Sequence, residues 1–399
     1  MPGRTVDLVA VGPPPRDPYD PAASAWALAG AYAARGDDVR VLHLPGSDAD
    51  RAPVGVVAVP VDIPLRRPGG PREPADFAAA AGRQLRKNAD LVLRDPVGLG
   101  SLGVPRTRRG PPVVAAFVRA VELHEFLGEH TPRPAAGFVD RLDTWLDRRS
   151  VRRLERSALL EADRLFYDAA EVAKSLREEY SIPERKLVAL APAVGDPSSR
   201  PSREASRQQL RVPLDVPVVV APTAFEAPEP SGLDRVLEAF RRVRPFFPGV
   251  RLIVVGSPAP TDPGVIALPD RRSETLSDAL AGADVAVFAR RVPGFDPGVV
   301  LAARAGVPPV VLPDARLPVD PAGGVRVAAS DDPGDLASVL AELLADPSAQ
   351  KEVARAAGRF AEAFLPERVA SAIGDAIAPS AAGPTATGRT RAVRRDATP

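Results

Sequence analysis

The feature that most constrains this chain is a repeated alternation of short apolar runs with helical patterns. The run 6–11 is rich in β-branched residues and ends at Gly12, as is typical of a buried strand. An alanine-rich stretch without helix breakers, 22–35, ends at Gly36, and a second apolar run covers 39–42. Strand, helix and strand with short connections form the basic unit of a parallel sheet. The sequence therefore predicts an α/β fold.

The alternation forms two series. The first series continues through predicted strands at 54–61, 90–93, 113–117 and 163–167 and predicted helices at 77–88 and about 138–163. Composition then shifts to Pro, Ser and Arg over 192–213, which indicates a linker. The second series has predicted strands at 218–220, 252–255, 284–288, 309–312 and 325–328 and predicted helices at 233–243, 273–282 and 298–305. We expect two doubly wound Rossmann-like domains, with ligands in the cleft between them.

These patterns set the predicted domain limits. An N-terminal Rossmann-like domain covers 1–192, and a C-terminal one covers 193–364. A helix at 365–377 follows, for which packing back on the N-terminal domain is one option. Residues 378–399 are small, polar and basic without apolar periodicity, so we predict a disordered tail.

Composition excludes several classes of site. The chain has no cysteine, which rules out disulfides and thiolate metal sites. Its 52 basic and 51 acidic residues nearly cancel, so charge gives no reason to expect nucleic acid as a partner. No stretch approaches the ~20 apolar residues of a transmembrane segment, and the run 6–11 is too short for a signal peptide. A cytoplasmic protein is the default expectation.

Motifs in the second half occur in the order and spacing of a known family. The stretches that carry this are 161–165, 181–187, 192–196, 232–240, 250–256, 283–288, 294–295 and 305–308. Together they resemble the group 1 retaining glycosyltransferases of GT-B fold, which use nucleotide-sugar donors. The resemblance implies a GT-B-like architecture with an interdomain cleft, an acceptor-type first domain and a donor-type second domain.

The resemblance also shows which expected residues this chain lacks. The family holds the donor diphosphate with an Arg and a Lys in the loop that here is 221–231. That loop has no basic residue, carries Glu226 and Glu229, and has Ser231 at the Lys position. Charge-assisted hydrogen bonds contribute roughly 1.5–3 kcal/mol each, and losing one preorganised charge-stabilising group costs about 10²–10³ in rate.

A second family feature, a pair of Glu residues eight positions apart, is also missing. Pro293 and Leu301 stand at the two positions. Because both donor features are absent, we expect catalysis to be weakened or lost, which would make the chain a pseudoenzyme.

The remaining site candidates come from what survives of these motifs. Asp296 replaces the second glycine of the family's Gly-Phe-Gly and is a substitute acid in a shifted alignment. Arg290 and Arg291 follow the predicted strand 284–288, where a site would lie. The donor-binding candidates are therefore Gly256, Arg290, Arg291, Gly294, Phe295 and Asp296.

On the acceptor side, His124 is a weak catalytic candidate, and a structural histidine is the alternative. His124 and His130 lack the i, i+4 spacing of a helical metal pair, so no metal is predicted or required. The run 98–103 matches a dinucleotide fingerprint, but a loop with Pro105 and arginines follows it where a helix is needed.

Three functions remain open. The first is a pseudo-glycosyltransferase or partner subunit of an intact glycosyltransferase. The second is a divergent, active retaining transferase that binds a nucleotide-sugar through Arg290 and Arg291. The third is an unrelated α/β binding protein or epimerase-type enzyme, which fold alone cannot exclude.

Overall fold

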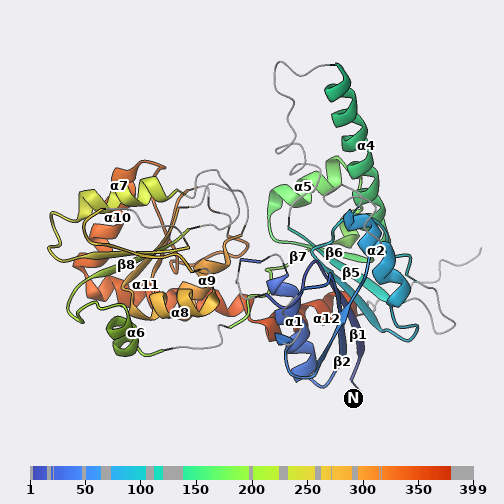
Figure 1. Cartoon of the computed structure of the whole chain (residues 1–399), viewed down its shortest axis with the longest axis horizontal. Helices are drawn as coiled ribbons and strands as arrows, with labels where there is room; N and C mark the ends of the chain where they lie inside the picture. Colours follow the sequence, from blue (N-terminus) through green and yellow to red (C-terminus); the bar gives the residue numbers. More distant parts are fainter. Residues whose placement is uncertain are drawn as a thin grey trace, which may run out of the picture.

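The computed structural model describes residues 3–15, 19–20, 22–46, 51–63, 73–104, 112–119, 138–196, 201–223, 232–256, 262–270, 272–289, 295–313, 315 and 317–378. They form two parallel sheets, each covered by helices (Figure 1). The two-domain α/β fold class predicted from the sequence is confirmed.

The first sheet has seven strands in the order β3-β2-β1-β4-β5-β6-β7. Its strands are β1 (Thr5–Ala10), β2 (Asp38–His43), β3 (Val56–Pro60), β4 (Leu91–Asp95), β5 (Val113–Val118), β6 (Arg164–Tyr167) and β7 (Leu187–Ala189). The central residues of β1, β4 and β5 are buried and mostly apolar, as expected for strands covered on both faces. β3 lies at one edge and ends at Pro60, a residue that edge strands tolerate.

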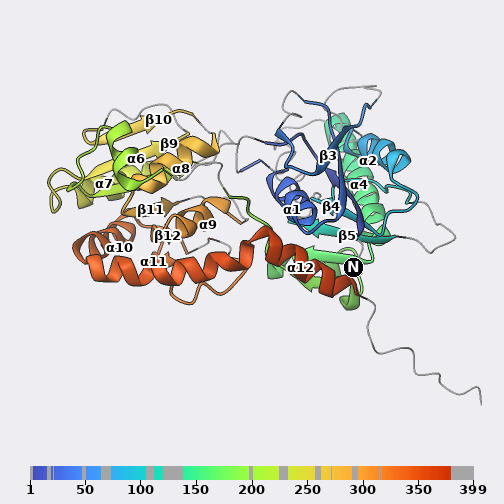
Figure 2. The same cartoon turned by 90° about the horizontal axis from the view of Figure 1, so that it is seen from below.

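Two helical layers enclose this sheet. One core cluster joins it to α2 (Glu73–Gln84), α4 (Phe138–Glu161) and α5 (Ala170–Glu178). The other joins it to α1 (Ala23–Ala34) and to the last helix of the chain, α12 (Pro366–Ile377). Buried Val369, Ala370 and Ile373 of α12 pack beside α1 in this cluster (Figure 2). The end of the chain thus covers the sheet formed by its beginning.

The second sheet has six strands in the order β10-β9-β8-β11-β12-β13. Its strands are β8 (Val218–Pro222), β9 (Arg251–Val255), β10 (Val265–Leu268), β11 (Val285–Phe288), β12 (Pro309–Val311) and β13 (Arg326–Val327). One face carries α7 (Leu233–Val243) and α10 (Pro333–Ala345). The other carries α8 (Ser273–Gly282), α9 (Pro297–Arg304) and α11 (Pro347–Ala361), and the short α6 (Arg203–Gln209) lies against α8.

Two chain crossings connect the halves, and they are bonded to each other. The first crossing runs through 191–196, and the second follows the 3₁₀ turn η3 (Glu362–Phe364). The Val194 amide donates to the Phe364 carbonyl at 3.0 Å. The Phe364 ring is fully buried and contacts Phe360 at a centroid distance of 5.0 Å. These contacts fix where the chain enters and leaves the second domain.

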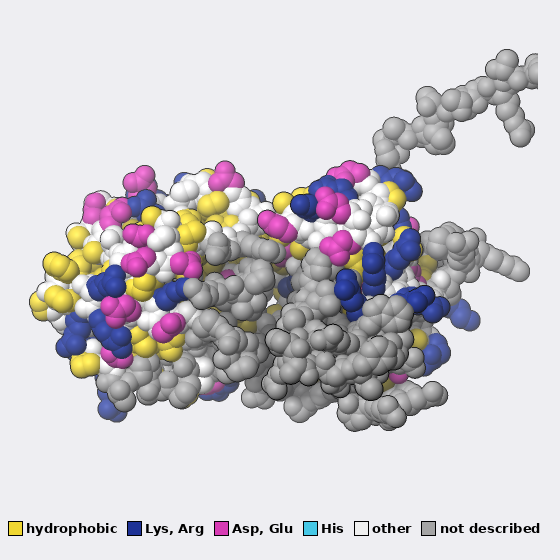
Figure 3. Space-filling view, turned by 90° about the horizontal axis from the view of Figure 1, so that it is seen from above, with side chains coloured by type: hydrophobic (Ala, Val, Ile, Leu, Met, Phe, Trp, Pro, Cys, Tyr) yellow, Lys and Arg dark blue, Asp and Glu magenta, His cyan; other side chains and the backbone are white. Residues whose placement is uncertain are grey.

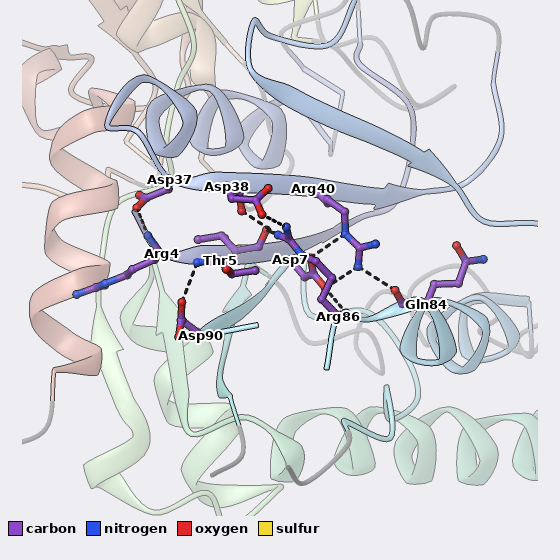
Figure 4. A network of polar contacts seen from close by, with 10 residues as sticks. Arg4, Thr5, Asp7, Asp37, Asp38, Arg40, Gln84, Arg86 and Asp90 are labelled. Carbon is purple, nitrogen blue, oxygen red and sulfur yellow. Dashed lines mark hydrogen bonds and ion pairs between the residues drawn. The ribbon is translucent and has the colours of Figure 1, made fainter. Parts of the chain in front are cut away.

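A buried carboxylate organises the amino-terminal edge of the first sheet (Figure 4). Asp7 of β1 is fully buried, and both oxygens accept hydrogen bonds from arginines. Arg40 of β2 donates at 2.9 and 3.1 Å, while Arg86 donates through its Nε and its backbone amide, both at 2.6 Å. Arg86 also donates to the Val6 and Asp38 carbonyls. The network thereby joins β1, β2 and the connection between α2 and β4.

Charged side chains of both signs are spread over the two domains (Figure 3). One local excess lies on α4, where the exposed arginines are Arg148, Arg149, Arg152, Arg153 and Arg156. Within the described ranges, no helix is long and apolar enough to span a membrane.

Some sequence predictions were wrong in detail. The helix predicted at 77–88 is α2, which starts four residues earlier and ends at Gln84. Pro74 occupies its first turn, where proline is tolerated, so a proline here does not prevent the helix from starting before residue 77. Strands β7 and β10 and helix α5 were not predicted. The predicted tail 378–399 lies, except for its first residue, outside the described residues.

Candidate functional site

The carboxyl ends of the second sheet are held together by a buried threonine and a glycine turn. Thr223 follows β8, and both its amide and its hydroxyl donate to the Val255 carbonyl at 2.9 Å. Gly256 follows β9 with φ of 90° and donates its amide to the Leu268 carbonyl at 2.7 Å. A side chain at 256 would strain this left-handed turn. Gly256, a predicted donor-side residue, therefore has a backbone role at the end of β9.

The start of α7 is pressed against the end of β11. Gly232 precedes α7 with φ of 65°, and a Cβ there would lie 2.0 Å from the Ala289 carbonyl oxygen. Only glycine fits this contact. The loop in which the sequence lacks phosphate-binding basic residues joins β8 to this glycine, and 224–231 lie outside the described residues.

Asp296 begins helix α9, and its carboxylate is used there. Its Oδ1 accepts from the Gly298 amide at 2.8 Å, the bond of a helix N-cap. Asp296 therefore satisfies a helix-end amide that could otherwise bind an anionic ligand.

Phe295 packs toward the domain crossing. Its ring stacks on Phe364 at a centroid distance of 5.0 Å and an interplanar angle of 5°. Phe295 and Asp296 thus lie together at the start of α9, whereas Arg290, Arg291 and Gly294 lie outside the described residues. His124 also lies outside them, so the acceptor-side candidate keeps its status as a prediction.

A tyrosine from the first domain reaches the same helix end. Tyr19 packs against the core cluster of the second domain that contains Phe288 and α9. A Cβ built on Gly298 would lie 2.2 Å from the Tyr19 hydroxyl oxygen and 2.6 Å from the Phe288 ring. Helix N-termini carry partial positive charge and attract anions. The Tyr19 hydroxyl therefore occupies space directly beside the amide end of α9.

The segment that carries Tyr19 is anchored in its own domain. Trp26 of α1 donates its indole Nε1–H to the Gly12 carbonyl at 3.0 Å. The Trp26 ring also meets buried His43 edge-on at 5.5 Å. His43 Nδ1 lies 2.7 Å from the Leu44 carbonyl, which selects the tautomer with the proton on Nδ1. Burial lowers the pKa of His43, so its ring is neutral near pH 7.

The carboxyl edge of the first sheet presents an aspartate and an arginine. Asp95 ends β4 and is fully buried, and Arg119 follows the neighbouring strand β5. Arg119 donates to Asp95 Oδ1 through Nη2 at 2.6 Å and Nε at 3.1 Å. Among the described residues, the other oxygen, Oδ2, has no hydrogen-bond partner. This oxygen retains its capacity to accept a hydrogen bond.

Sequence reasoning missed Tyr19, Asp95 and Arg119. A signal existed for the last two, because each is a charged residue at or just after the end of an apolar strand, where α/β sites lie. Tyr19 had no such signal, since its importance depends on how two domains meet. Among the described residues, no cluster of three or more His, Asp or Glu side chains suits a metal ion.

Two family models match the chain, one for each half. The model described as Glycosyltransferase Family 4 matches residues 22–195, and that described as Glycosyl transferases group 1 matches residues 216–346. No curated protein matches the chain significantly.

Solved structures match over nearly the whole chain. WaaG, a glycosyltransferase involved in lipopolysaccharide biosynthesis, is 18% identical, with 92% of this chain and 99% of WaaG covered and a TM-score of 0.67. Sucrose-phosphate synthase from Thermosynechococcus elongatus is 17% identical, with 93% and 98% covered and a TM-score of 0.65.

HepE from Anabaena, solved in complex with UDP and glucose, is 13% identical, with 93% and 98% covered and a TM-score of 0.63. At identities this low, the structural matches show the fold alone. The two family models show in addition that the sequence resembles glycosyltransferases. The chain thus has the GT-B fold and resembles the group 1 glycosyltransferases in both of its domains.

Proposed function

We propose that this chain is a glycosyltransferase-like protein with weakened or lost sugar transfer, acting as a partner subunit of an intact glycosyltransferase. The observation that carries the proposal is that groups of the chain itself occupy the N-terminal end of α9. Its amide end is capped by Asp296 and faced by the Tyr19 hydroxyl, two groups of the chain itself. A donor phosphate would have to displace both groups to use this helix end.

Charge supports the same proposal. The sequence of 221–231 has no Arg or Lys and has two Glu. A diphosphate brought near it would meet repulsion in place of charge-assisted hydrogen bonds. Two missing charge-stabilising groups, each contributing about 10²–10³ in rate, would leave little ordinary turnover.

The alternative is a divergent retaining transferase that binds its donor through Arg290 and Arg291. The buried Asp95 carboxylate favours keeping this alternative, because its Oδ2, at the carboxyl edge of the first sheet, has no hydrogen-bond partner among the described residues. HepE was solved with UDP and glucose, so the fold does accept a nucleotide and a sugar in that protein.

Calorimetric titration with UDP, GDP and their sugar conjugates separates the two. The partner-subunit proposal predicts no saturable heat at millimolar nucleotide. The active-transferase alternative predicts micromolar binding that is lost when Arg290 and Arg291 are both replaced by Ala. Binding by the unaltered protein together with transfer of the sugar to any acceptor would overturn the proposal.

A further inference from the structure

A cavity lies in the C-terminal domain. It has a volume of about 320 Å³ and is lined by α8, α9, the start of α6 and the turns that lead into β11 and β12. Ala283 precedes β11, and Gly306 and Val307 precede β12. Residues that precede parallel strands lie at the amino-terminal edge of a sheet, whereas the candidate cleft lies at the carboxyl edge. The cavity is therefore a separate site, which we call the hinge pocket.

The walls of the hinge pocket are mostly aliphatic. Leu276 and Leu280 of α8, Leu301 of α9 and Val307 line it, and all four belong to the buried core of the domain. Its volume is at the lower end of the roughly 300–1,000 Å³ typical of small-molecule pockets. An aliphatic chain entering it would remove apolar surface from water.

The polar side chains at the hinge pocket include two arginines. Arg203 is 39% exposed and donates to the Ala283 carbonyl at 3.0 Å and to Asp284 Oδ1 at 2.6 Å. Arg207, fully buried, binds the other oxygen of Asp284 at 2.8 Å. One carboxylate thus pairs with two guanidinium groups, and the exposed guanidinium, that of Arg203, lies at the pocket.

The second pocket arginine holds the domain linker. Arg304, the last residue of α9, is only 7% exposed. It donates to the Val194 carbonyl at 2.7 Å, to the Gly195 carbonyl at 3.3 Å and to Asp196 Oδ1 at 3.0 Å. Asp196 is 55% exposed, so an anion from solvent can compete with it for this guanidinium. A ligand in the hinge pocket is therefore placed to change how firmly the first crossing is held.

We propose that the hinge pocket binds a small amphiphilic anion, an aliphatic chain ending in a carboxylate, and that its occupancy loosens the hold of Arg304 on the linker. The chain packs between α8 and α9, and the carboxylate meets the guanidinium groups of Arg203 and Arg304. The site stands whether or not the cleft retains sugar transfer, because the two lie at opposite edges of the sheet.

Octanoate is the probe, titrated by calorimetry below its micelle concentration. We expect saturable 1:1 binding that tightens about fourfold per added methylene from hexanoate to octanoate, the equivalent of about 0.8 kcal/mol each. Octanol, which lacks the charge, should bind at least tenfold more weakly. No saturation by octanoate, or equal binding of octanol, overturns the proposal.

Variants locate the binding. Ala281 lines the pocket and is half-buried, so Ala281→Phe should fill it and abolish octanoate binding. Ala345→Phe is the matched control, since Ala345 is exposed at the end of α10, and it should bind octanoate like the parent. Arg203→Gln should weaken binding about tenfold. Unchanged binding by both pocket variants would overturn the assignment.

Hydrogen exchange tests the effect on the linker. The Val194 amide is bonded to the Phe364 carbonyl, so peptides spanning 191–196 report directly on the crossing. Saturating octanoate should speed exchange in these peptides in the parent and leave it unchanged in Ala281→Phe. Binding without any change in linker exchange would refute the proposed effect on Arg304.

Discussion

Replacing the buried carboxylate of Asp7 should destabilise the first domain severely. Asn keeps the shape of Asp but removes the charge that faces Arg40 and Arg86, whose side chains are 23% and 15% exposed. Removing one partner of a buried ion pair typically costs 3–5 kcal/mol, because the remaining charges are left in a poorly solvated place. We therefore expect Asp7→Asn to lower the free energy of unfolding by about 3–5 kcal/mol.

A matched control uses the same arginine. Asp38 pairs with Arg86 Nη1 at 2.6 Å, but its side chain is 67% exposed. Exposed pairs contribute about 0–1 kcal/mol, so Asp38→Asn should cost no more than that.

Urea unfolding followed by tryptophan fluorescence measures both variants, since the two tryptophans, Trp26 and Trp145, lie in α1 and α4 of the first domain. Equal small losses in the two variants would refute the reasoning that burial sets the cost.

Two further changes test the second domain and the chain crossing. Arg207→Met should lower the free energy of unfolding of the second domain by about 3–5 kcal/mol, because it leaves the Asp284 carboxylate with one arginine and several carbonyls without their donor. Proteolysis rates in urea measure this loss, and resistance equal to that of the parent would contradict it. Phe364→Ala should cost about 3–5 kcal/mol by leaving a cavity beside Phe295; a thermal unfolding curve matching the parent would argue against the crossing as a packed element.

His43 should make the first domain less stable in acid. Its pKa is lowered by burial, so the unfolded chain binds the proton more readily. The contribution of His43 to the free energy of unfolding is therefore fully present above the unfolded pKa of about 6.5. It falls as the pH drops below that value, by at most about 1.4 kcal/mol per pH unit. His43→Gln should remove this part of the slope between pH 6.5 and 5 in urea titrations. An unchanged slope in the variant would show that another group is responsible.

The parallel strands were predictable where the chain provides β-branched runs. Two examples are the buried runs Val6 to Ala10 and Leu252 to Val255, in which Asp7 is the one polar residue. Each run is followed closely by a glycine turn. β7 and β10 were not predicted, because both are edge strands of three or four residues, partly exposed, and lack the buried apolar run that marks the others.

The candidate site was less predictable than the fold. Local sequence identified the α9 start, since Asp296 precedes a proline and a helical apolar pattern. It could not show that Asp296 is a cap, nor that Tyr19, nearly 280 positions earlier, reaches the same helix end. Such contacts depend on how two separately folded sheets meet, and no local pattern encodes that.

The central claim is that this chain's own groups occupy the donor end of the cleft. Titration of UDP into the parent protein and into Tyr19→Ala tests it most directly, with Tyr19→Phe as the control that keeps the ring beside Gly298. The account predicts no saturation of the parent or of Tyr19→Phe at millimolar UDP, and measurably tighter binding, by at least tenfold, in Tyr19→Ala. Micromolar binding by the parent that Tyr19→Ala does not improve would contradict it.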